Sequence, residues 1–171
     1  QMKKISCASL SPDDMLSLLE ITRGYCGTAD SWQTLRPLLE RKEAWGFYKG
    51  ASLVGYALFA PSDRQLSGSV TLTCFRYRWE YNDETSLLQM MELIPASFAA
   101  RFHCLLMDVS RTHELNLDFY HRIGFCDSIL PSPKGRGNVV LLADLKSFPV
   151  MKKEKRLFLC LTIGKGCARI S

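Results

Sequence analysis

The chain has 171 residues, and 47% of them are hydrophobic while 23% are charged. This length suits one ordinary domain with a hydrophobic core, and the composition excludes a disordered chain. No apolar stretch approaches the roughly 18 residues of a membrane-spanning helix, and the first residues lack the apolar centre of a secretory signal. We therefore expect a cytoplasmic protein that does not act at a membrane.

The net charge of +5 is concentrated in one segment. From Lys146 onward there are seven basic residues and one acid, whereas residues 1–145 carry 15 basic residues and 16 acids. The nearly neutral charge of residues 1–145 argues against nucleic acid as a partner.

The seven cysteines are widely scattered without a C-x-x-C pair, and the histidines show no ligand spacing with them. This pattern predicts reduced, mostly buried thiols and no metal site.

The first third of the chain predicts a strand followed by two helices. The strand covers residues 3–10. Ser11 is a typical helix N-cap, with Pro12 at the first helical position and two acids after it, and a glycine at position 24 or 27 ends this helix. A second helix is expected over residues 30–43, with a break at Pro37 because proline removes a backbone donor.

A β-hairpin comes next, with strands at 44–48 and 52–60 around a short turn that contains Gly50. A polar loop precedes a strand at 70–79, which is rich in β-branched and aromatic residues. Residues 83–101 form the clearest helical pattern, and Pro95 is expected to kink it or end it early.

The apolar run 104–109 predicts a strand buried on both faces. Strand, helix and buried strand in this order predict a parallel βαβ unit. A short helix at 114–122 ends at Gly124. Two strands follow, at 125–130 and 138–145, with a proline- and glycine-rich loop between them.

This order of elements resembles the GNAT superfamily of acetyl-coenzyme-A-dependent N-acyltransferases, and three motifs support the likeness. The second hairpin strand contains Val54-Gly55, and the end of the buried strand reads Met107-Asp108-Val109-Ser110-Arg111-Thr112-His113. The third motif, Phe119-Tyr120-His121-Arg122-Ile123-Gly124-Phe125, matches the family's Phe-Tyr-x-x-x-Gly-Phe. The resemblance implies an α/β (α+β) fold, a single domain over residues 1–145 with a mixed, partly splayed β-sheet flanked by helices.

The resemblance also implies an activity, the transfer of an acetyl group from acetyl-CoA to an amine of a small molecule or peptide. Tyr120 occupies the position of the family's general acid, and a phenol with a pKa near 10 still holds its proton at neutral pH. Asp108 is expected to accept the amine proton. Glu80 also lies near a strand end, but for this carboxylate a solvated surface position is the favoured interpretation. The alternative for Tyr120 is that its ring only packs a short helix on the sheet.

Two segments are expected to hold the coenzyme. The strand backbone at Cys74, Phe75 and Arg76 pairs with the pantetheine arm, and the diphosphate lies at the helix start formed by Asn82, Asp83, Glu84 and Thr85. His113 and Asn116 fall where the family contacts the same ligand. For His113, a helix-capping or partly exposed side chain is the alternative.

The phosphate loop departs from the family pattern of Gln/Arg-x-x-Gly-x-Gly/Ala. Alignment places Trp79, Asn82 and Glu84 at its three defining positions. Side chains there crowd phosphate oxygens, and a carboxylate repels them. The second hypothesis is therefore a catalytically inactive GNAT-fold module for ligand binding or assembly that has lost CoA binding.

Residues 146–171 form a basic and apolar C-terminal extension. A basic stretch at 151–156 precedes the seven apolar or β-branched residues 157–163, a run long enough for a strand but too short to cross a bilayer. Because an exposed apolar strand promotes aggregation, we expect a covering partner, such as a second copy in a homodimer.

Overall fold

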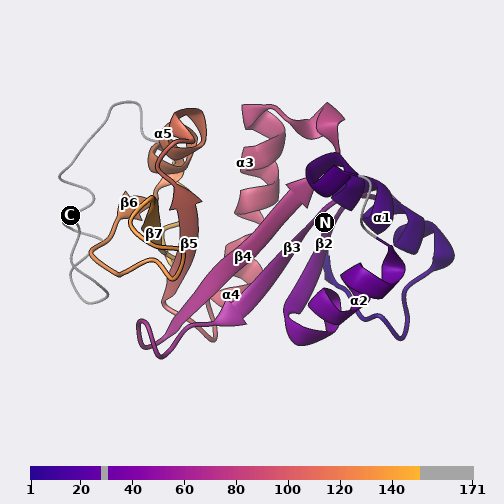
Figure 1. Ribbon diagram of the computed structural model, residues 1–171, viewed down its shortest axis with the longest axis horizontal. Coiled ribbons are helices and arrows are strands. Elements are labelled where there is room, and N and C mark those ends of the chain that lie inside the picture. The colour runs from indigo at the N-terminus through magenta and orange to yellow at the C-terminus, as the bar shows by residue number, and fades with distance from the viewer. Residues whose placement is uncertain (28–30, 151–171) are drawn as a thin grey trace. The chain divides into compact units, whose positions relative to one another are not determined.

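The computed structural model describes residues 1–27 and 31–150. Its strands form one mixed sheet of seven in the order β1-β2-β3-β4-β5-β7-β6, which confirms the predicted α/β class (Figure 1). In chain order the elements are β1 (Met2–Lys4), α1 (Pro12–Cys26), α2 (Trp32–Arg41), β2 (Glu43–Lys49), β3 (Ser52–Pro61), β4 (Ser69–Tyr77), η2 (Trp79–Tyr81), α3 (Glu84–Glu92), α4 (Ile94–Phe98), β5 (Cys104–Ser110), α5 (Glu114–Ile123), β6 (Cys126–Asp127) and β7 (Asn138–Asp144).

Two compact units make up the described chain. The first unit contains Gln1–Ala60 and Thr73–Leu93, and the second contains Pro61–Leu72 and the chain from Ile94 onward. Strand β4 contributes to both, because its first four residues belong to the second unit. The predicted extension lies outside the described residues from position 151 onward, and so does the apolar run at 157–163.

In the first unit, α1 begins as its sequence predicts. The Ser11 hydroxyl accepts the Asp14 amide hydrogen at 3.1 Å, Pro12 follows the cap, and Gly27 ends the helix at a φ of 73°. Buried side chains of α1 and α2 pack on one face of the β2–β3 hairpin. This cluster contains Ile5, Leu18, Ile21, Leu35, Leu39, Ala44, Leu53, Tyr56 and Leu58.

The predicted break of the second helix at Pro37 is wrong, because α2 continues through this residue. Leu35 and Leu39 flank the proline and are both buried, so burial of this face holds the helix together despite the missing amide donor. The expected start at position 30 lies outside the described residues.

The predicted hairpin is confirmed, with β2 and β3 paired antiparallel from Glu43–Phe59 to Lys49–Ser52. Gly50 makes the turn possible because its φ is +61°, a conformation that other residues rarely adopt. Strand β1 is shorter than the predicted 3–10. After Ile5 donates to the Ala44 carbonyl, the chain turns away through a bond from the Ser9 amide to the Ser6 carbonyl.

The long helix predicted over 83–101 is two helices, α3 and α4, which meet at Leu93. The break falls two residues before Pro95. Pro95 lies in the first turn of α4, where a helix needs no amide donor, but it cannot donate to the preceding turn and so cannot continue α3. The expected early end of the helix at this proline is confirmed.

The second unit contains the predicted parallel pair. Strand β5 pairs with the start of β4 from Ser69–Cys104 to Leu72–Met107, and with β7 antiparallel over its whole length. Helix α5 ends at Gly124, as predicted, where φ is +123°. The strand expected at 125–130 is only Cys126–Asp127, because the Leu130 amide turns back to the Ser128 hydroxyl.

The expectation of reduced thiols is wrong for two cysteines. Cys104 and Cys126 are fully buried and each is disulfide-bonded, whereas Cys7, Cys26 and Cys74 form no disulfide. Within residues 1–27 and 31–150, no helix is long and apolar enough to cross a membrane, and no group of three metal-ligating side chains occurs.

Candidate active site

The start of α3, predicted to receive the diphosphate, is closed by its own N-cap. One carboxylate oxygen of Asp83 accepts the Ser86 amide hydrogen at 2.8 Å, and the other accepts the Ser86 hydroxyl at 2.7 Å. The bond from the Ser86 amide is the main cause that lowers the pKa of Asp83, so this side chain is charged at neutral pH. Glu84 and Thr85 are exposed beside it. The Ser86 amide, one of the donors that an anion would use at this helix start, is therefore already engaged with a carboxylate.

The side chains at the end of β4 are held by contacts within the first unit. The Phe75 ring lies between the rings of Phe47 and Tyr77, at centroid distances of 5.7 and 5.2 Å. The Tyr77 hydroxyl donates to the Asn82 side-chain oxygen at 2.9 Å, which fixes the predicted loop residue Asn82. Cys74 is half-buried.

Arg76 ends a buried chain of hydrogen bonds that runs into α1. The Thr22 hydroxyl donates to the Leu18 carbonyl at 2.7 Å, so the Tyr56 hydroxyl must donate to Thr22, at 2.8 Å. Tyr56 in turn accepts from the Arg76 guanidinium at 3.0 Å. Burial raises the pKa of Tyr56 and keeps this phenol neutral.

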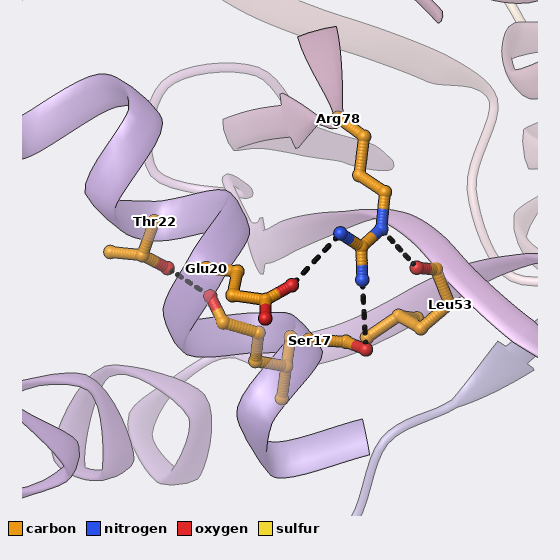
Figure 2. Close-up of polar contacts among 6 residues, drawn as sticks. Ser17, Glu20, Thr22, Leu53 and Arg78 are labelled. Carbon is orange, nitrogen blue, oxygen red and sulfur yellow. Dashed lines mark hydrogen bonds and ion pairs between the residues drawn. The ribbon is translucent and has the colours of Figure 1, made fainter. Parts of the chain in front are cut away.

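Arg78, two residues further on, is also directed toward α1. Its guanidinium donates to the Leu53 carbonyl, the Glu20 carboxylate and the Ser17 hydroxyl at 3.1, 2.9 and 3.0 Å (Figure 2). Arg76 and Arg78 are therefore both engaged by partners within the first unit.

In the second unit, Asp108 fastens the loop between β6 and β7. Its two carboxylate oxygens accept the Ser132 hydroxyl at 2.6 Å and the Asn138 side-chain amide at 2.8 Å. Neither Ser132 nor Asn138 was predicted to belong to the site. The spacing along the chain gave no signal for them, because they reach Asp108 only through the pairing of β5 with β7.

Tyr120 lies on α5, half-buried, with its ring 5.5 Å from that of Phe119 and 5.8 Å from that of Phe125. His113 is at the N-cap position of this helix, but its side chain makes no capping hydrogen bond. His113 and Asn116 line a shallow surface hollow. Because positions three or four and seven apart share a helix face, these two residues and Tyr120 lie along one side of α5.

A cavity that the sequence did not predict lies beside the hairpin turn in the first unit. Its volume is about 370 Å³, and its lining includes Lys49, Tyr81 and Gln89 over an apolar floor that includes Val54 and Met90. The Lys49 ammonium lies 5.6 Å from the centre of the Tyr81 ring. The lining contains none of the predicted site residues.

The sequence matches no family model and no curated protein. Solved structures resemble the fold despite low identity. The ribosomal-protein-S18-alanine N-acetyltransferase from Escherichia coli is 13% identical, with a TM-score of 0.61 over 92% of this chain and 97% of its own. The fold is GNAT-like. An aminoglycoside 6'-acetyltransferase type Ii is 14% identical, with a TM-score of 0.63 over 85% of this chain and 97% of that one.

A third GNAT-like relative in structure is a chain of the NatC complex bound to Gag peptide and CoA. It is 11% identical, with a TM-score of 0.62 over 84% of this chain and 97% of its own. These likenesses confirm the resemblance at the level of the fold. Within the GNAT-like chain, the predicted residues fall into two sets, those around β4 and α3 in the first unit and those on β5 and α5 in the second.

Proposed function

We propose that this protein is an N-acyltransferase that moves an acetyl group from acetyl-CoA to an amine of a small molecule or peptide. The observation that carries the proposal is the GNAT-like fold, shared over 84–92% of the chain with three acetyltransferase structures. These proteins are named for, or bound to, a ribosomal protein, a Gag peptide and an aminoglycoside, which supports both peptides and small molecules as classes of acceptor.

Tyr120 supplies the acid that this reaction needs. The amine nitrogen bonds to the thioester carbonyl carbon, the carbon–sulfur bond breaks, and the departing thiolate takes the proton of the Tyr120 phenol. The amine gives up its own proton to Asp108 through water. Two neighbouring donors hold Asp108 in one orientation, which favours a defined proton path.

The diphosphate of the co-substrate does not fit the start of α3 as this chain builds it, because the Asp83 carboxylate engages the Ser86 amide. This observation favours a second candidate function, a GNAT-fold module that binds another ligand or partner and does not bind CoA. The two candidates differ in one measurable property, the affinity for CoA.

Calorimetric titration with acetyl-CoA separates the two candidates, and mass spectrometry of an amine panel detects the acetylated product. The enzyme requires saturable binding and product formation that depends on the protein. An absence of binding at millimolar acetyl-CoA eliminates the transferase and leaves the second candidate.

A further inference from the structure

At the end of β4, the phenol of Tyr25 occupies a backbone amide that a bound molecule could otherwise use. We call such a side chain an internal ligand. The Tyr77 amide donates to the Tyr25 hydroxyl at 3.2 Å, and the two rings meet edge to face at 5.9 Å. The next amide, that of Arg78, donates to the Val54 carbonyl on β3 at 2.8 Å. Successive amides of an extended strand point to opposite edges, so Tyr25 covers the edge of β4 that does not face β3. A ligand carbonyl that pairs with this amide must replace the Tyr25 oxygen.

The start of α3 carries a second internal ligand, the carboxylate of Asp83. It accepts from both the amide and the hydroxyl of Ser86, as a phosphate oxygen would. With Glu84 exposed in the same turn, this helix start is negatively charged. A diphosphate placed here would be repelled by the carboxylates of Asp83 and Glu84. It would also gain little from the helix dipole, because these carboxylates already compensate it.

The two arginines at the end of β4, Arg76 in the strand and Arg78 just after it, are engaged with other partners. Figure 2 shows the Arg78 guanidinium enclosed by Ser17, Glu20 and the Leu53 carbonyl. Arg76 donates to the buried Tyr56 hydroxyl. Both arginines therefore serve the packing of α1 on the sheet.

We propose that Tyr25 and Asp83 are internal ligands at the end of β4 and the start of α3. The pantetheine thioester of the donor binds at β4 by displacing the Tyr25 hydroxyl, whereas its nucleotide diphosphate finds the start of α3 closed by Asp83 and adds little affinity. The inference rests on the proposed function and specifies its donor class. It predicts that acetyl-CoA and the acetyl thioester of pantetheine bind with nearly equal affinity.

The test is a calorimetric comparison of these two donors on the wild type and on Asp83→Ser. Serine preserves the N-cap, so α3 keeps its start while one negative charge is removed. The expected dissociation constants for the wild type agree within about threefold, and Asp83→Ser tightens acetyl-CoA on the order of fivefold without changing the pantetheine thioester. Asp13→Ser is the matched control, because it removes an exposed acid from the first turn of α1.

Tyr25→Phe tests the second internal ligand. It keeps the ring contact with Tyr77 and releases the amide, so both donors are expected to bind roughly threefold tighter. Tyr48→Phe is its control, since that phenol bonds to Asp14 on α1 and not to the edge of β4.

The outcomes separate this inference from the proposed function. Wild-type binding of acetyl-CoA at least a hundredfold tighter than the pantetheine thioester overturns the inference and leaves the transferase standing. Unchanged affinities in both Asp83→Ser and Tyr25→Phe also overturn it. If neither donor binds to the wild type or to either variant at millimolar concentration, the proposed function itself is wrong.

Discussion

Helices α3 and α5 begin in opposite ways. At the start of α3 the Ser86 amide is engaged by the Asp83 carboxylate, whereas α5 begins at an exposed His113 that makes no side-chain capping bond and borders a surface hollow. The comparison indicates that this chain uses the start of α3 for its own stability. The side of α5 that carries Tyr120 keeps His113 and Asn116 beside a surface hollow, which is where the proposed acid chemistry would be tested first.

Replacement of Tyr120 is the strongest test of this difference between α3 and α5. Tyr120→Phe is expected to lower kcat by about 10²- to 10⁴-fold, because the thiolate loses its proton donor. Donor affinity should stay unchanged in calorimetry. An equal loss of turnover and affinity, with a lower melting temperature, would assign Tyr120 to packing alone. Tyr48→Phe is the matched control.

Asp108 tests whether a carboxylate of the second unit does more than fasten a loop. Asp108→Asn keeps an oxygen for the Ser132 hydroxyl but removes the proton acceptor, so kcat should fall about 10²-fold in steady-state assays. Asp108→Ala should also reduce the free energy of unfolding in urea by about 1 to 2 kcal/mol. Full turnover by the asparagine variant would contradict the role of base.

Replacement of Tyr56 tests whether the hydrogen bonds of the first unit serve stability alone. Tyr56→Phe leaves Arg76 without its buried acceptor, and the free energy of unfolding should fall by about 1 kcal/mol. Urea unfolding checks this value. Turnover should not change, because the hydrogen-bond chain from Arg76 to Leu18 serves packing. A loss of activity without a loss of stability would instead connect Arg76 to the reaction.

Tyr48 provides a further test, at alkaline pH. Burial, together with the bond to Asp14, raises the pKa of Tyr48 to about 12. The folded chain thus favours the protonated phenol, and this contribution to stability is complete below the unfolded pKa of about 10 and is lost as pH rises toward 12. The stability difference between wild type and Tyr48→Phe should therefore shrink over this range in urea titrations. A constant difference would contradict the assignment.

Local signals predicted the elements whose ends depend on a few neighbouring residues. Ser11 and Pro12 begin α1, Gly50 forms the hairpin turn, and Gly124 ends α5, because each meets a backbone requirement within a few positions. The continuation of α2 through Pro37 was missed. There, the burial of Leu35 and Leu39 outweighs a local preference against helix.

The sequence by itself determined the order of elements, the parallel pairing of β4 with β5 and the resemblance to GNAT acyltransferases. It also exposed the missing glycines of the phosphate loop. Only the tertiary structure decided which polar groups are already engaged: Tyr25 reaches Tyr77 across 52 positions, and Asn138 reaches Asp108 across 30. Periodicity and caps act within a few residues, whereas these partners are chosen by strand pairing and by packing of helices on the sheet. The accessibility of a site is therefore a property of the fold.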